Sequence, residues 1–145
     1  MQADLNVSCD LPVPPDAAFA AVLDWEGQAR WIPFTRTRVL DGSPGVGQRV
    51  VARTAVGPLG FDDRMTVTYW DPPRRCEVLK TGRAVRGAGA FVVEGTPTGS
   101  RFTWELRMLV PGGPLAPVIW PLARLISRAS LALALRRLVS LLERA

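Results

Sequence analysis

Histidine is missing from this 145-residue sequence, and only two cysteines and one tyrosine are present. Histidine is the commonest general base near neutral pH, so its absence excludes Ser-His and Cys-His nucleophile pairs. The two cysteines, Cys9 and Cys76, lie far apart and give no ligand spacing typical of a zinc site. We therefore expect neither a metal nor a cofactor, and any acid–base chemistry would depend on carboxylates, the tyrosine or arginines.

Long apolar runs are also missing. The apolar C-terminal stretch is interrupted by Pro117, Pro121, Arg124 and Arg128, so it does not reach the ~18 uninterrupted apolar residues of a membrane span. The N-terminus lacks the basic segment and apolar run of a secretory signal. These features predict a soluble, cytoplasmic protein.

Acidic residues are scarce near the C-terminus. Residues 115–145 hold five arginines and only one acid, Glu143, so they carry a net charge of +4 out of +5 for the chain. A basic amphipathic helix of this kind can make a peripheral membrane contact or bind an acidic partner. The competing interpretation is a solvated helix face in an arginine-rich protein. No stretch combines basic residues with repeated stacking aromatics, which argues against nucleic acid binding.

The length predicts a single domain, residues 1–145, with a sizeable core. Alternating apolar and polar residues predict strands, which we place at residues 4–11, 36–40, 46–56, 61–70, 75–80, 87–94 and 101–109. Two short helical segments, at 17–23 and 24–34, separate the first two strands, and one long helix covers 115–144. Short turns between consecutive strands indicate an antiparallel sheet curved around the long helix, with room for a ligand in the gap between them.

The strand at 61–70 presents two candidate functional residues on its apolar face, Asp63 and Tyr69. A buried carboxylate is costly unless it is paired or hydrogen-bonded, so Asp63 is a candidate cavity acid, assisted by Arg53 or Arg128. Alternatively, Asp63 lies at the strand end, within reach of water. Tyr69 is either a donor to a ligand carbonyl or a core residue whose hydroxyl is satisfied at the edge.

The long helix changes its apolar face half-way along. Before Ala129 the apolar residues lie opposite Arg124 and Arg128, whereas from Leu131 onward the leucines occupy the side that carried those arginines. Three arrangements are consistent with this pattern: a kink near Ala129, arginines that look into a space lined by the sheet, or a solvent-exposed first half with its own small apolar cluster.

Two segments, residues 13–33 and 62–105, resemble the polyketide cyclase/dehydrase and lipid-transport family of the START-like (SRPBCC) superfamily. The resemblance rests on Trp25 and Trp31, on the Asp-Pro-Pro-Arg turn at 71–74, on Thr-Gly at 81–82 and on the Gly-Ser-Arg-Phe-Thr-Trp run at 99–104. It implies an α+β helix-grip fold, in which a seven-stranded antiparallel sheet wraps around the C-terminal helix and encloses a hydrophobic cavity. In that topology the first strand pairs with the last, which separates Cys9 from Cys76 and predicts no disulfide.

The predicted cavity would bind a small hydrophobic molecule such as a lipid, quinone or polyketide-like compound, without catalysis. The alternatives are a polyketide aromatase/cyclase or dehydratase using Asp63 or Tyr69, and a module that binds a membrane surface or a partner through the basic helix. The sequence leaves open whether the chain is a monomer or a homodimer. Trp120 is placed where it could gate the cavity. The residues that we expect at the cavity are Trp25, Trp31, Phe34, Asp63, Met65, Tyr69, Trp104, Met108, Trp120 and Arg128.

Overall fold

The computed structural model describes residues 2–83, 85–110 and 113–144. The strands are β1 (Gln2–Leu11), β2 (Thr35–Asp41), β3 (Arg49–Val56), β4 (Leu59–Asp71), β5 (Arg75–Thr81), β6 (Arg86–Thr96) and β7 (Gly99–Leu109). The helices are α1 (Pro15–Val22), the short 3-10 helices η1 (Glu26–Arg30) and η2 (Gly113–Leu115), and α2 (Ala116–Arg144). The predicted order of elements is therefore correct.

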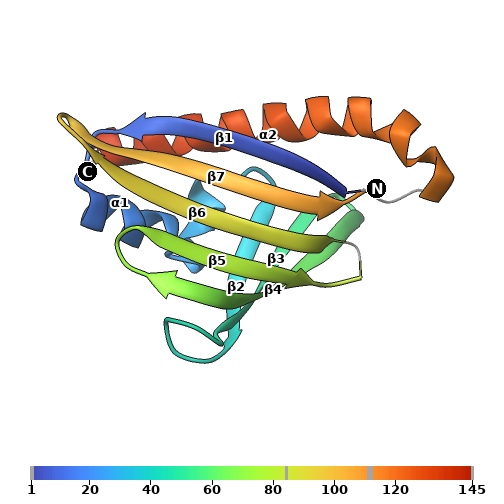
Figure 1. The fold of residues 1–145 in the computed structure, drawn as a ribbon, viewed down its shortest axis with the longest axis horizontal. Helices are drawn as coiled ribbons and strands as arrows, with labels where there is room; N and C mark the ends of the chain where they lie inside the picture. Colours follow the sequence, from blue (N-terminus) through green and yellow to red (C-terminus); the bar gives the residue numbers. More distant parts are fainter. Residues whose placement is uncertain (1, 84, 111–112, 145) are drawn as a thin grey trace.

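The strands form one antiparallel sheet in the order β1-β7-β6-β5-β4-β3-β2, and α2 lies alongside β1 (Figure 1). The first strand pairs with the last over its whole length, from Gln2 opposite Leu109 to Leu11 opposite Ser100. This topology confirms the helix-grip prediction. Cys9 and Cys76 are both free thiols, on β1 and β5.

Aromatic side chains on the inner face of the sheet form the centre of the core. In β7 the alternation is regular, and it buries Phe102 and Trp104 on the same side. The Phe91 ring stacks on Trp104 with centroids 5.7 Å apart, and Trp31 meets Trp104 edge-on at 5.8 Å. The second half of α2 packs on the same core through Leu138 and its neighbours.

The two halves of α2 have opposite environments. Leu135 and Leu138 are buried in the main core, whereas Val118 and Leu122 are 76% and 64% exposed. The start of the helix is held by a separate cluster of Ala3, Val110 and Ala116, against which Trp120 packs. Of the three arrangements considered, the exposed first half with its own cluster is confirmed.

A β-bulge in β4 moves Tyr69 to the outer face of the sheet. Val67 pairs with Val78 and Tyr69 with Glu77, so Thr68 is an extra residue without a partner on β5. One inserted residue reverses which side chains point inward beyond it. Trp70 therefore faces the core, where it meets Phe19 edge-on at 5.3 Å, and Tyr69 is 45% exposed. The placement of Tyr69 on the inner face was wrong for this reason.

Candidate functional site

A cavity of about 380 Å³ lies between the inner face of the sheet and the middle of α2. Its walls come from β2 to β7, from η1 and the segment that follows it, and from residues 126–131 of α2. Most of the lining is apolar, which is typical of sites for small organic ligands. The apolar residues at its walls include Ile32, Ala52, Met65, Val78, Phe91, Trp104, Leu106, Met108, Ile126 and Leu131.

One ion pair is buried in this apolar surface. The Lys80 ammonium Nζ lies 2.5 Å from Asp63 Oδ2 and donates a weaker hydrogen bond to Met65 Sδ at 3.5 Å. The Lys80 and Asp63 side chains are only 8% and 14% exposed. The pair follows from the register, because Lys80 is opposite Met65 on the neighbouring strand and Asp63 is two residues further along the same face.

The ion pair leaves hydrogen-bonding capacity unused at the cavity wall. Asp63 Oδ1 is buried, and it accepts no hydrogen bond within the described residues. An ammonium group has three hydrogens, and Lys80 uses two of them, on Asp63 and Met65. A buried polar atom without a partner is uncommon and costly in a folded protein. The pair therefore keeps one ammonium hydrogen and one carboxylate oxygen without a partner, and the oxygen lies just behind the cavity surface.

Four of the residues expected at the cavity do line it: Asp63, Met65, Trp104 and Met108. They come from β4, before its bulge, and from β7, where the alternation is regular. Asp63 is not assisted by Arg53, which pairs instead with Asp62 on the outer face at 3.3 Å.

Trp25 and Trp31 belong to the core that supports the cavity and do not line it. They are 5% and 1% exposed, and the Trp25 indole Nε1 donates to Gln48 Oε1 at 3.1 Å. Trp120 packs in the small cluster at the start of α2, so it is not a gate. Each of these three tryptophan rings packs in an apolar cluster, because a packed position buries more of the ring surface than a cavity wall does.

Phe34, Tyr69 and Arg128 also lie outside the cavity, on the surface. Phe34 is 68% exposed, Tyr69 follows the bulge described above, and Arg128 borders a groove between α2 and β1. Arg128 lies on the side of α2 turned toward β1, so it cannot reach the space that Ile126, Ser127 and Ser130 border. The prediction that these three side chains contact a cavity ligand is corrected accordingly.

Lys80 is the candidate site residue that the sequence interpretation missed. It is the only lysine in the chain, and it shares the inner face of β5 with the buried Cys76 and Val78. Two features of the sequence therefore pointed to Lys80. It is the one lysine beside seventeen arginines, and the alternation of β5 places it on the same face as apolar residues. An inward lysine opposite an inward aspartate on the adjacent strand predicts a buried ion pair.

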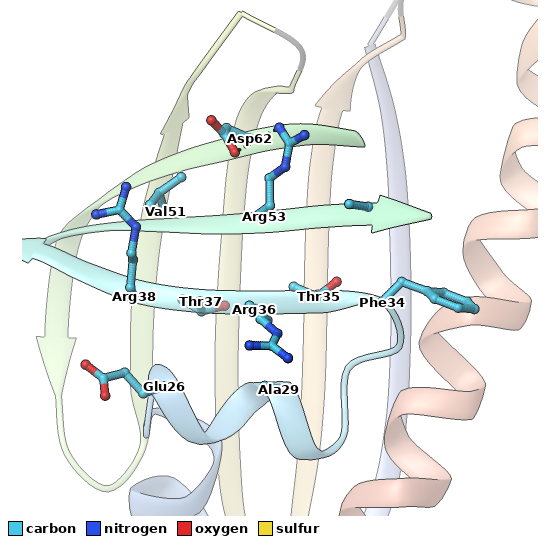
Figure 2. A pocket seen from close by; sticks show the side chains of 11 residues that line it. Glu26, Ala29, Phe34, Thr35, Arg36, Thr37, Arg38, Val51, Arg53 and Asp62 are labelled. Carbon is cyan, nitrogen blue, oxygen red and sulfur yellow. Dashed lines mark hydrogen bonds and ion pairs between the residues drawn. The ribbon is translucent and has the colours of Figure 1, made fainter. Parts of the chain in front are cut away.

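A second, open groove crosses the outer side of β2 and β3 next to η1 (Figure 2). Arg36, Arg38 and Arg53 project from its strands, with Glu26 and Asp62 beside them. These charged groups are exposed to water, so the groove offers little apolar burial to a small organic ligand. No group of three or more Cys, Asp and Glu side chains that could hold a metal ion occurs within residues 2–83, 85–110 and 113–144.

Solved structures with the same fold include two proteins described as aromatase/cyclases. The ZhuI aromatase/cyclase from Streptomyces sp. R1128 is 16% identical, with a TM-score of 0.76 over 99% of this chain and 95% of its own. The di-domain aromatase/cyclase StfQ of the steffimycin biosynthetic pathway is 14% identical, with a TM-score of 0.77. The match covers 99% of this chain and 51% of StfQ, about half of that protein.

A protein without a named activity is similar to the same degree. Protein CV1439 from Chromobacterium violaceum is 15% identical, with a TM-score of 0.74 and 97% of both chains covered. At these identities the likeness shows the fold alone. Among curated proteins no significant match was found. The sequence itself matches the family described as polyketide cyclase/dehydrase and lipid transport over residues 2–143. The chain therefore belongs to the polyketide cyclase/dehydrase and lipid transport family.

Proposed function

We propose that the protein binds a small, mostly apolar molecule with one polar end, such as a lipid, quinone or polyketide-like compound, and does so without catalysis. The observation that carries this proposal is the buried Lys80–Asp63 pair in the wall of an otherwise apolar cavity. Burial of apolar surface, at about 25 cal/mol per Å², supplies most of the affinity. The polar end of the ligand would contact Lys80 and Asp63, which fixes its orientation.

The geometry specifies what that polar end should contain. Lys80 Nζ has a hydrogen to donate and suits a carbonyl oxygen, while Asp63 Oδ1 lies just behind the cavity surface and would accept from a ligand hydroxyl after a small rotation of the carboxylate. A hydroxyketone, a phenol beside a carbonyl or a hydroquinone presents both groups within a few bonds. The volume of about 380 Å³ is at the small end of the usual range for organic ligands, which favours a molecule of one to three rings or a short acyl chain.

Native mass spectrometry of the protein as purified tests the proposal, followed by identification of any retained compound after organic extraction. We expect a mass in excess of the chain that disappears on denaturation. The double variant with Asp63→Leu and Lys80→Met removes the polar pair and leaves no unpaired charge, so it should retain at least about tenfold less of a hydroxyl- or carbonyl-bearing ligand.

Asp62→Asn is the matched control, because Asp62 is the neighbouring aspartate, is 46% exposed and pairs with Arg53 on the outer face. It should retain ligand like the wild type. Equal retention by the double variant would show that the ion pair does not contact the ligand. An empty protein that also fails to take up any member of a panel of lipids, quinones and aromatic polyketides would contradict the binding function itself.

A polyketide cyclase or dehydratase activity is the second candidate function. It is favoured by membership of a family with that description and by the same ion pair. An ammonium that donates to a ketone oxygen and a carboxylate that takes a proton from the adjacent carbon are the groups that an aldol-type ring closure needs. Turnover of a poly-β-ketone surrogate by the wild type, lost in the double variant Asp63→Leu/Lys80→Met, which should remain folded, and kept in Asp62→Asn, would establish the enzyme in place of the binder.

A further inference from the structure

The first half of α2 exposes an apolar surface that the fold of a single chain does not cover. Val118, Leu122, Leu125 and Ile126 are 76%, 64%, 67% and 61% exposed, and Ile119 is 41% exposed. We call these five residues the docking face. Their spacing places most of them on one outward side of the helix. Contiguous exposed apolar surface of this kind is typical of a site that binds a membrane or a protein.

The outward side of α2 becomes basic further along the helix. Arg136 and Arg144 follow Val118, Leu122 and Leu125 at helical spacing on that same side, with Arg137 beside them. These arginines are exposed, and none of the five arginines of α2 forms an ion pair within the described residues. The outward side of α2 is therefore apolar in its first half and positively charged in its second half.

The docking face borders the mouth of the cavity. Ile126 belongs both to the docking face and to the cavity lining, and Phe61 of β4, 40% exposed, lines the same cavity from the opposite side. Near Phe61, the turn between β3 and β4 exposes Val56 and Leu59 at 60% and 77%. Phe34 projects from the start of β2, on the side where α2 lies (Figure 2). Ile126 and Phe61 thus place apolar side chains on two sides of the cavity, and further exposed apolar residues lie near Phe61.

We propose that this end of the molecule docks on the surface of an anionic lipid bilayer, with α2 lying in the plane of the interface. The docking face would insert among the lipid headgroups and upper acyl chains, and Arg136, Arg137 and Arg144 would contact lipid phosphates. The charge of +4 over residues 115–145 matches an anionic membrane and does not match a second copy of the same basic surface. In this orientation the cavity mouth faces the bilayer.

The fold requires α2 to lie on the membrane and not to span it. The segment Gly113–Arg144 contains an 18-residue window with mean hydropathy 1.5, of which 11% is buried, so length and composition alone would permit a span. However, Leu135 and Leu138 hold the second half of α2 in the main core, and a spanning helix would have to leave that core. A long helix with one apolar and one basic part fits the interface better.

Flotation with vesicles tests the proposal and needs no knowledge of the cavity ligand, so its result is separate from that of the proposed function. The wild type should bind vesicles of phosphatidylcholine with about 30% phosphatidylserine, and bind pure phosphatidylcholine vesicles at least about tenfold less. Binding should weaken between ~0.1 M and ~0.5 M salt, because salt screens the arginines.

Two variants separate the apolar and the basic contribution. Val118→Asp with Leu122→Asp should lower vesicle binding by more than about tenfold, whereas Val46→Asp, equally apolar and 68% exposed on the loop at the opposite end of β2, should lower it little. Arg136→Gln with Arg137→Gln should lower binding to anionic vesicles more than Arg36→Gln with Arg38→Gln, which removes the same charge from β2.

These substitutions alter exposed side chains, so thermal unfolding should confirm that every variant is folded. Wild-type protein that does not float with anionic vesicles, or a Val118→Asp/Leu122→Asp variant that floats like the wild type, would overturn the proposal. A third result would also overturn the proposal. If the wild type does not bind vesicles and sediments as a dimer, and if Val118→Asp/Leu122→Asp sediments as a monomer, the docking face is a homodimer interface.

Discussion

At the scale of single residues, the Lys80–Asp63 pair has large energetic consequences, because both charges are removed from water. Neither side chain is more than 14% exposed. Attraction between the two charges offsets their desolvation only while both are present. By contrast, the exposed pairs on the outer face, such as Arg53 with Asp62, contribute about 0–1 kcal/mol.

Removing one member of the buried pair should therefore destabilise the protein strongly. We expect Asp63→Asn to lower the free energy of unfolding by about 3–5 kcal/mol, because it leaves the Lys80 ammonium buried without a counter-charge. The double variant with Asp63→Leu and Lys80→Met should stay within about 1 kcal/mol of the wild type or exceed it. Urea denaturation measures both, with Asp62→Asn as control. If Asp63→Asn unfolds at the same midpoint urea concentration as the wild type, water must reach the ion pair in the folded protein.

The two cysteine thiols should react slowly in the folded protein. Burial raises the pKa of Cys9 from 9.0 to about 11, with a smaller contribution from Asp10, and burial raises the pKa of Cys76 to about 12. At pH 8 the reactive thiolate should be about a hundredfold scarcer at Cys9 and about a thousandfold scarcer at Cys76 than in the unfolded chain. A disulfide reagent such as dithionitrobenzoate should modify both thiols quickly in denaturant and slowly without it.

The same shifts make stability depend on pH in the alkaline range. Unfolded thiols ionise near pH 9, before the folded ones do, so the unfolded state binds fewer protons between pH 9 and pH 12. The free energy of unfolding should therefore fall as the pH rises through this interval. A thiol that reacts at pH 8 as fast in the folded protein as in denaturant would contradict the burial of that cysteine.

At this scale the sequence predicted the residues that regular alternation governs. Asp63, Met65, Trp104 and Met108 were correctly placed at the cavity, since each lies on an uninterrupted stretch of its strand. Tyr69 could not be placed, because the bulge at Thr68 depends on the pairing of β4 with β5 and leaves no mark in the local pattern. Trp25 and Trp31 were placed at the cavity because sequence cannot distinguish a cavity wall from a packed core.

At the scale of elements, α2 combines a core helix and a surface helix in one continuous segment. Its change of apolar face was visible in the sequence, but this pattern was equally consistent with a kink, with arginines facing the sheet and with an exposed first half. The choice among these arrangements depended on tertiary packing: Leu135 and Leu138 of the second half enter the main core, whereas the first half is held by the small cluster around Ala116. That packing is a property of the assembled fold and not of the helix sequence.

Equivalent leucine truncations in the two halves of α2 should have very different effects. Leu138→Ala, at a position 1% exposed in the core, should lower the free energy of unfolding by about 2–5 kcal/mol. Leu122→Ala, at a position 64% exposed, should change it by less than about 0.5 kcal/mol. Urea denaturation of the two variants provides the comparison. A large loss in Leu122→Ala would show that the docking face is covered in solution.

At the scale of the whole molecule, the cavity is the feature that would allow this fold to bind a ligand. A sheet that curves around a helix leaves an unfilled volume between them. The side chains that line this volume make fewer van der Waals contacts than they would in a packed core. Filling that volume from within should therefore strengthen the fold, and filling it with a ligand should do the same by mass action. The two ways of filling are mutually exclusive, which allows them to be separated by experiment.

Ser127→Phe should fill the cavity from α2, because Ser127 is part of its lining. We expect the free energy of unfolding to rise by about 0.5–2 kcal/mol and the co-purifying compound to be lost. Leu133→Phe places the same ring at a position that is 41% exposed and borders neither the cavity nor the groove between α2 and β1, so it should change neither quantity. Added ligand should raise the melting temperature of the wild type and of Leu133→Phe in a concentration-dependent manner, but not that of Ser127→Phe. If Ser127→Phe is stabilised by the ligand as much as the wild type is, the ligand binds elsewhere on the molecule, and the groove between α2 and β1 becomes the next site to test.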